Sequence, residues 1–126
     1  MSKANLEHVN LTVADPDHSA ALLSRIFDWH IRWQGDAMNN GRTVHIGNEK
    51  CYLALYSPQH LADDAHTASH FIGSLNHVAL VVDDLDLIEQ RVKKEGLEPF
   101  NFGHYEPGQR FYFLDLDGIE FEIVQY

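Results

Sequence analysis

The sequence predicts an α+β fold in which two βαβββ modules form a curved mixed sheet around a cavity. The first observation is a repeat, because LEHVNLTVADPD (6–17) and LNHVALVVDDLD (75–86) are identical at seven of twelve positions. The other two are that a helix-like amphipathic segment follows each copy, and that three short strand-like runs follow each of these segments. A chain of 126 residues has the size of one domain. We expect one domain over 1–126, with module 1 at about 4–57, a linker at 58–74 and module 2 at about 75–126.

The repeated segment, at 6–17 and 75–86, predicts a strand and then a helix in each module. Its apolar residues alternate with polar ones, which is typical of a strand with one buried face. In the first copy, Asp15 is a suitable N-cap and Pro16 suits the first helical position. In the second copy, Asp84 takes the capping position and Gly96 marks the end of the helix. Both modules therefore begin with the same strand–helix pair.

Three strand-like runs follow each predicted helix, and turn residues separate them. The segment between the modules is polar and rich in small residues, so we expect a linker that holds at most a short helical turn. The strand-like runs lie at 30–34, 42–47 and 51–57 in module 1, and at 97–102, 110–115 and 119–125 in module 2.

The composition limits the kinds of molecule that the protein is expected to bind. The formal net charge is −10 at pH 7, which argues against nucleic acid and against an anionic membrane surface but permits a cationic ligand. The single cysteine, Cys51, excludes an internal disulfide. The N-terminal segment has no apolar run typical of a secretory signal, and no stretch has the length of a membrane span. We therefore expect a cytoplasmic location.

Alternation along the strands places two histidines on the face that the helices do not cover. Successive strand residues point to opposite faces, and the apolar face should lie beneath the module's own helix. His8 then lies on the cavity face of the first strand, and His77 takes the same place in module 2. Glu122 lies on the cavity face of the last strand. A buried carboxylate needs a charged or metal partner, so these three side chains belong together.

The last two strands of each module also align. Placed together without a gap, RTVHIGNEKCYLALY and RFYFLDLDGIEFEIV put Arg42 on Arg110 and Ala54 on Glu122. The four equivalent cavity positions 8, 54, 77 and 122 therefore hold His, Ala, His and Glu. Two histidines and one carboxylate form a facial triad for a divalent cation, Fe2+, Mn2+, Ni2+ or Zn2+, with open positions for water, oxygen or substrate. A single half-buried strand histidine is usually a hydrogen-bonded core or pocket residue, so the prediction depends on the coincidence of both histidines with Glu122.

Other residues are candidates for catalysis or for substrate binding. His104 lies in FGHYEPGQ, which predicts a loop over the cavity mouth, and it is either an acid–base group or a solvated loop histidine. Tyr112 either points into the cavity and holds a substrate oxygen or packs among aromatic residues. Asn10 on the cavity face is a candidate substrate contact. The remaining candidates for the substrate-binding lining are Tyr52, Ala54 and Phe102.

At HVNLTVAD, NHVALVVDDLD and RFYFLDLDGIEFEIV the sequence resembles the vicinal oxygen chelate superfamily, which includes glyoxalase I, bleomycin-resistance proteins, fosfomycin-resistance proteins and extradiol dioxygenases. The resemblance covers essentially the whole chain and implies the glyoxalase-like fold of paired βαβββ modules. It also implies a divalent metal at His8, His77 and Glu122, and a small-molecule substrate that binds through vicinal oxygens. Extradiol dioxygenases use this ligand set without a fourth protein ligand, so the ligand pattern is closest to theirs.

Three other activities stay open within the resemblance. Glyoxalase-type lyases and isomerases carry a ligand where this chain has Ala54. Fosfomycin-type transferases have three ligands and a tyrosine as at Tyr112, but Phe102, Glu106 and Arg110 stand where residues that contact the phosphonate are expected. Bleomycin-resistance proteins bind a drug without chemistry and generally lack the metal ligands. The resemblance and the long linker together point to a homodimer that exchanges modules between subunits.

Overall fold

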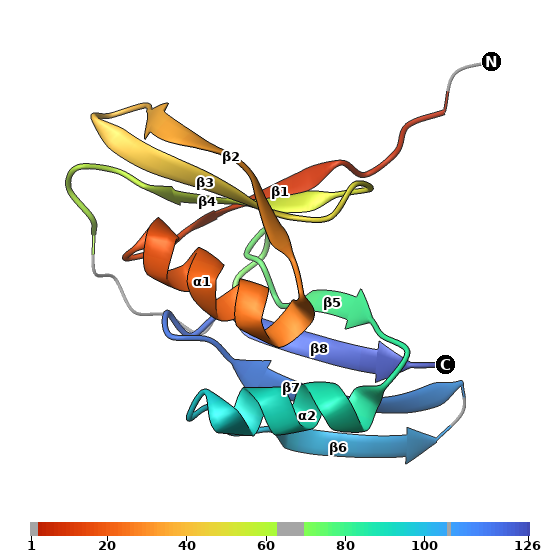
Figure 1. The fold of residues 1–126 in the computed structure, drawn as a ribbon. Helices are drawn as coiled ribbons and strands as arrows, with labels where there is room; N and C mark the ends of the chain where they lie inside the picture. The colour runs from red at the N-terminus through yellow and green to blue at the C-terminus, as the bar shows by residue number, and fades with distance from the viewer. Residues whose placement is uncertain (1–2, 63–69, 106) are drawn as a thin grey trace. The chain divides into compact units, whose positions relative to one another are not determined.

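The structure is a computed structural model that describes residues 3–62, 70–105 and 107–126. The chain divides into two compact units, Met1–Ala62 and Asp63–Tyr126. Each unit contains a four-stranded mixed sheet and one helix in the order βαβββ (Figure 1). The predicted α+β fold of two modules is therefore confirmed, with the strands joined by hydrogen bonds into two four-stranded sheets.

In the first unit, the sheet has the strand order β1-β4-β3-β2. β1 runs parallel to β4, and the other neighbouring strands are antiparallel. The order follows from the connections, because a helix separates β1 from β2 and two hairpins then bring β4 back beside β1. The elements are β1 (His8–Thr12), α1 (Pro16–Phe27), β2 (His30–Ala37), β3 (Gly41–Gly47) and β4 (Tyr52–Ser57).

The second unit repeats this arrangement with the strand order β5-β8-β7-β6. β5 runs parallel to β8, and the two remaining pairs are antiparallel. The repeated segment in the sequence therefore corresponds to equivalent strand–helix pairs, β1 with α1 and β5 with α2. The elements are β5 (Val78–Val81), α2 (Leu85–Lys94), β6 (Phe100–Tyr105), β7 (Gly108–Leu114) and β8 (Glu120–Gln125).

Both helices begin where the sequence predicts. Asp15 accepts a hydrogen bond from the backbone N–H of His18 at 3.1 Å, and Asp84 accepts one from Leu87 at 3.1 Å. These bonds satisfy donors that the first helical turn leaves without a partner. Gly96 follows α2 with a φ of +80°, a conformation that favours glycine and ends the helix. No helix among the described residues is long and apolar enough to cross a membrane.

Each helix covers one face of its own sheet (Figure 1). By strand alternation, the opposite, open face carries the candidate residues His8, Ala54 and Glu122. Alternation decides which side chains meet the helix, since every second residue of a strand points to the same face. The largest fully buried side chains are Val13, Leu23, Ile26, Val44, Ile46 and Leu55 in the first unit, and Val92, Phe111, Phe113, Phe121 and Ile123 in the second.

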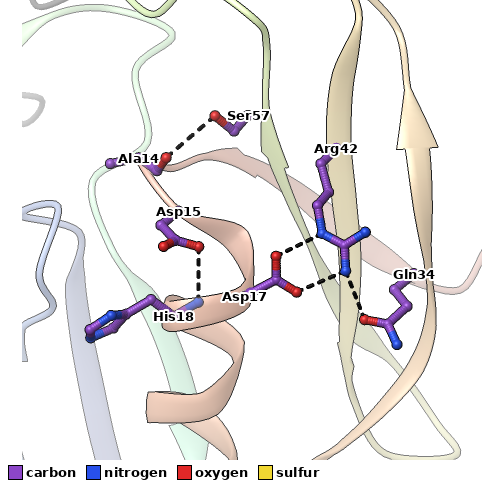
Figure 2. A network of polar contacts seen from close by, with 7 residues as sticks. All are labelled: Ala14, Asp15, Asp17, His18, Gln34, Arg42 and Ser57. Atoms are coloured by element: carbon purple, nitrogen blue, oxygen red, sulfur yellow. Dashed lines mark hydrogen bonds and ion pairs between the residues drawn. The ribbon is translucent and has the colours of Figure 1, made fainter.

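A polar network also ties α1 to its sheet. Arg42 of β3 donates from Nε and Nη2 to the two carboxylate oxygens of Asp17, at 2.7 and 2.8 Å. Nη2 also donates to Oε1 of Gln34 at 2.9 Å, as Figure 2 shows. Because Asp17 lies in α1, Arg42 points to the helix-covered face of β3.

The hairpins that carry the candidate site differ in length. Residues 48–51 join β3 to β4, whereas residues 115–119 join β7 to β8. The β7–β8 hairpin therefore has one residue more than the β3–β4 hairpin. The ungapped alignment of Arg42 with Arg110 is wrong because it does not allow for this residue. The strand registers show that Thr43 stands where the second unit has Arg110. A shift of one residue moves a side chain to the other face of a sheet.

The strand β6 begins later than the sequence predicts. The backbone N–H of Leu97 donates to the carbonyl of Val92 at 3.2 Å, so the chain still turns after α2 and the strand starts at Phe100. The predicted loop around His104 is also wrong, because His104 pairs with Gln109 in the hairpin of β6 and β7. Glu106 lies outside the described residues.

Candidate metal and substrate site

A buried carboxylate is the centre of the site in the second unit. The side chain of Glu122 in β8 is 10 % exposed. Its Oε1 lies 3.0 Å from Nε2 of His77, and its Oε2 accepts a hydrogen bond from Nη1 of Arg110 at 3.0 Å. The ring of Tyr112 meets the His77 ring edge-on, with 5.8 Å between centroids. The structure therefore brings together His77, Tyr112 and Glu122.

The second nitrogen of each candidate ligand histidine is held by the preceding residue. Nδ1 of His77 lies 2.8 Å from Oδ1 of Asn76. Nδ1 of His8 lies 2.7 Å from Oε1 of Glu7 in the first unit. Metal-binding histidines usually donate one ring N–H to such a partner, which fixes the tautomer and leaves the other nitrogen for the metal. The atom left for a metal is Nε2 in both histidines, and in His77 it faces Oε1 of Glu122.

The pair formed by His77 and Glu122 fits a divalent cation. Nitrogen and oxygen ligands lie at about 2.0–2.2 Å from such ions, so two neighbouring ligands at right angles are about 3 Å apart. The observed distance between Nε2 and Oε1 is 3.0 Å. Within neither unit do the described residues gather three His, Cys, Asp or Glu side chains into a metal site. The third ligand, His8, therefore stays a prediction.

In the first unit, the equivalent sheet face carries stacked rings. The ring of Tyr52 stacks against those of His8 and His45, with centroids 4.9 and 4.6 Å away. The guanidinium of Arg32 lies 4.5 Å above the Tyr52 ring. Burial, and next the nearby His8, lower the pKa of His45, which favours its neutral form. Tyr52 is thereby fixed beside the candidate ligand His8.

A pocket of about 460 Å³ continues this face toward the end of β1. Two rows of paired strand residues form its floor, and Ala37 and Met38 form an apolar edge. One row holds Asn10, Ala54 and His45, and the next holds Thr12, Tyr56 and Thr43.

Some of the predicted substrate-binding residues lie at this pocket and others do not. Asn10 lines the pocket, and the buried Ala54 lies between two lining residues in the same row. Phe102 lies elsewhere, with its ring centroid 6.0 Å from that of Phe111, which belongs to the buried core. Phe100, not Phe102, borders Tyr112, at 6.0 Å between centroids.

His104 also lies away from the carboxylate. Paired residues of antiparallel strands point to the same face, and His104 pairs with Gln109, the neighbour of Arg110. Arg110 points toward Glu122, so the side chain of His104 belongs to the opposite face. Arg110 was not predicted as a partner of Glu122. Its even spacing from Tyr112 could have revealed it, since both share the cavity face of β7.

Two βαβββ units, each with one four-stranded mixed sheet and one helix, define a class of paired-module proteins. The chain belongs to the Glyoxalase/Bleomycin resistance protein/Dioxygenase superfamily, whose sequence profile matches residues 5–123. The predicted membership of the vicinal oxygen chelate superfamily is therefore confirmed. None of the curated proteins matches the sequence.

Solved structures share the fold at low sequence identity. A glyoxylase/bleomycin resistance protein/dioxygenase domain from Frankia sp. EAN1pec is 24% identical, with a TM-score of 0.85 over 98% of this chain and 93% of that one. The fosfomycin resistance protein FosX of Listeria monocytogenes, complexed with Mn(II) and sulfate, is 19% identical, with a TM-score of 0.73 over 99% and 94%. FosX of Mesorhizobium loti is 24% identical, with a TM-score of 0.71 over 98% and 92%.

Proposed function

We propose that the protein is a divalent-metal-dependent enzyme whose metal is held by His8, His77 and Glu122. The observation that carries the proposal is the 3.0 Å distance between Nε2 of His77 and Oε1 of Glu122. Each atom is oriented by a second contact, from Asn76 to the imidazole and from Arg110 to the carboxylate. Such outer contacts are what a preorganised metal site requires.

His8, His77 and Glu122 would hold the cation and leave part of its coordination free, and the cation would supply Lewis-acid polarisation of two adjacent substrate oxygens. Arg110 occupies Oε2 of Glu122, which directs the carboxylate to act through Oε1 alone. Tyr112 lies beside the His77 ring, and its hydroxyl is the group that we propose to hold a substrate oxygen. The chain's own contribution is therefore to orient the ligands and the substrate.

Ring opening of catechols is the reaction that we propose first. The position equivalent to Glu122 is Ala54, which has no group to bind the metal or to carry a proton. That absence disfavours the lyase and isomerase chemistry that needs a fourth acidic group, and it leaves room at the metal for a chelating substrate and oxygen. Mn2+ is a further metal to test, since the FosX structure from Listeria contains it.

The test loads the protein with Fe2+ without oxygen, adds a panel of catechols, and admits air. We expect a yellow ring-opened product from at least one catechol and none with Glu122→Ala. Glu98→Ala is the matched control, because Glu98 is an exposed carboxylate of the same unit that lies outside its strands. Absence of colour with every catechol, in protein that holds its metal, contradicts ring opening and leaves another reaction of the metal site.

A further inference from the structure

The pocket of the first unit is uncharged in an acidic protein. The chain has 19 acidic and 9 basic residues. The described residues that line the pocket include no lysine, arginine, aspartate or glutamate. They offer the amide of Asn10, the hydroxyls of Thr12 and Thr43, and the ring of His45.

Comparison with the second unit explains why space exists there. Glu122 and Arg110 fill the equivalent sheet face with a carboxylate–guanidinium pair 3.0 Å apart. In the first unit, the registers place Ala54 and Thr43 at these two positions. Replacing the ion pair by two short side chains removes both the charge and the volume, and the pocket lies over this place.

The wall of the pocket is preformed. The hydroxyl of Tyr56 donates to the backbone carbonyl of Met38 at 3.0 Å and accepts from Nδ2 of Asn39 at 3.1 Å. Both contacts use the turn between β2 and β3, so they hold that turn against β4. Asn10 and Thr12 lie on β1 with their side chains on the open face. A small set of fixed polar groups in a mostly apolar recess is typical of a small-molecule site.

We propose that this pocket binds an uncharged part of the substrate that carries an amide, hydroxyl or carbonyl group. The inference rests on the proposed function, because the vicinal oxygens of the same molecule would bind the metal beside His8. Asn10 follows His8 by two residues on the same face of β1, about 6.6 Å along the strand. A substrate held at His8 therefore extends over Asn10 into the pocket. A carboxylate or phosphonate there would lose hydration without a cationic partner.

Two catechols that differ only in charge test the proposal: 3,4-dihydroxybenzamide, which is neutral, and 3,4-dihydroxybenzoate, which is anionic at pH 7. Isothermal titration of zinc-loaded protein without oxygen should give a dissociation constant at least about ten times lower for the amide. Equal affinities, stronger binding of the benzoate, or no binding of the amide at millimolar concentration would overturn the inference.

A charge placed in the pocket should change this preference. Thr12→Lys puts a cation on an exposed position of the lining, so the ratio of affinities should shift toward the benzoate by about ten-fold. Ala21→Lys adds the same charge on the exposed side of α1 and should leave the ratio unchanged. Equal shifts in both variants would contradict the pocket. Metal content of each sample, measured separately, tells a failure of the pocket from a failure of the proposed metal site.

Discussion

The two units have the same strand order but different chemistry on their open faces. The first unit presents stacked rings and a neutral pocket, and the second presents a buried carboxylate held by histidine and arginine. Two equivalent positions account for most of the contrast, Ala54 and Thr43 in one unit against Glu122 and Arg110 in the other. The comparison shows that the alternating core specifies the fold, whereas a few open-face residues specify the site.

Arg42 and Arg110 show that the register of a strand decides which face of the sheet a side chain occupies. Arg42 lies on the helix side and binds Asp17, with side chains 40 % and 55 % exposed. Arg110 lies on the open side and binds Glu122, with side chains 16 % and 10 % exposed. The extra residue in the hairpin between β7 and β8 separates the two outcomes, because it moves the arginine to the other face.

Ala54→Glu should have the largest effect on stability, because it places a carboxylate in the first unit without the arginine that the second unit has. Ala54 is 2 % exposed, and an unpaired buried charge should lower the free energy of unfolding by about 3–5 kcal/mol. Chemical denaturation measures the loss.

Two further variants separate charge from size at this position. Ala54→Gln has nearly the same size as Ala54→Glu without the charge, so it should lose clearly less stability. Adding Thr43→Arg to Ala54→Glu should restore at least about 1 kcal/mol as a coupling energy. Equal losses for glutamate and glutamine, with no coupling to arginine, would show that the two units do not correspond at these positions.

Arg110→Met should have the next largest effect. It leaves Glu122 buried with one partner fewer, so we expect a loss of about 2–4 kcal/mol in the free energy of unfolding at pH 7. Arg42→Met is the control, and its exposed ion pair should contribute much less. A loss for Arg42→Met as large as that for Arg110→Met would contradict the distinction between the two faces.

Asp115→Ala should lower the free energy of unfolding by about 1–2 kcal/mol. Oδ1 of Asp115 accepts hydrogen bonds from the backbone N–H groups of Asp117 and Ile119, both at 2.9 Å. Asn48 accepts in the same way from Lys50 and Cys51 in the other hairpin. Asp115→Asn keeps a side-chain acceptor oxygen like that of Asn48. It should therefore lower the free energy of unfolding less than Asp115→Ala does.

The pH dependence of the Asp115 variants follows from its pKa. Burial raises the pKa of Asp115 above its ordinary value, against the effect of the backbone hydrogen bonds. The native state thus holds the proton more tightly than the unfolded state. Wild type should gain stability relative to Asp115→Asn as the pH falls through the native pKa. Denaturation curves from about pH 7 to pH 4 that keep a constant difference would contradict this assignment.

Asp17→Asn should have the smallest effect. The hydrogen bonds from Arg42 lower the pKa of Asp17, mainly by favouring its charged form. A lowered native pKa gives stability that is present above the unfolded pKa and disappears as the pH falls through the native pKa. Thermal unfolding should show a small decrease in Tm at pH 7 and no difference at about pH 2. A decrease that persists at the lower pH would show a packing effect instead of the ion pair.

Much of the fold follows from the sequence, because the signals are local. Asp15 and Asp84 mark the two helix starts, and the repeated strand shows which residues face the core. The bounds of β6 could not be predicted, since they depend on where the chain stops turning after α2. The equivalence of Thr43 with Arg110 was missed because a difference of one residue between hairpins appears only in the strand pairing.

The site could be predicted only in part. The repeat pointed to His77 and Glu122, which the structure places 3.0 Å apart. The contacts that orient them come from Asn76 and Arg110. No local sequence pattern predicts such contacts between side chains. The place of Phe102 depends on a shift in the pairing of β6 and β7, which turns its ring toward Phe111.

The most direct test of the central claim is a metal titration of purified, chelator-treated protein. We expect about one Zn2+ or Mn2+ ion per chain, and at least a roughly 100-fold weaker affinity in His8→Ala, His77→Ala and Glu122→Gln. Glu98→Gln, which changes an exposed carboxylate of the same unit, should keep the wild-type affinity. Undiminished binding in any of the three ligand variants, or no stoichiometric binding of either ion to the wild type, would contradict the proposed metal site.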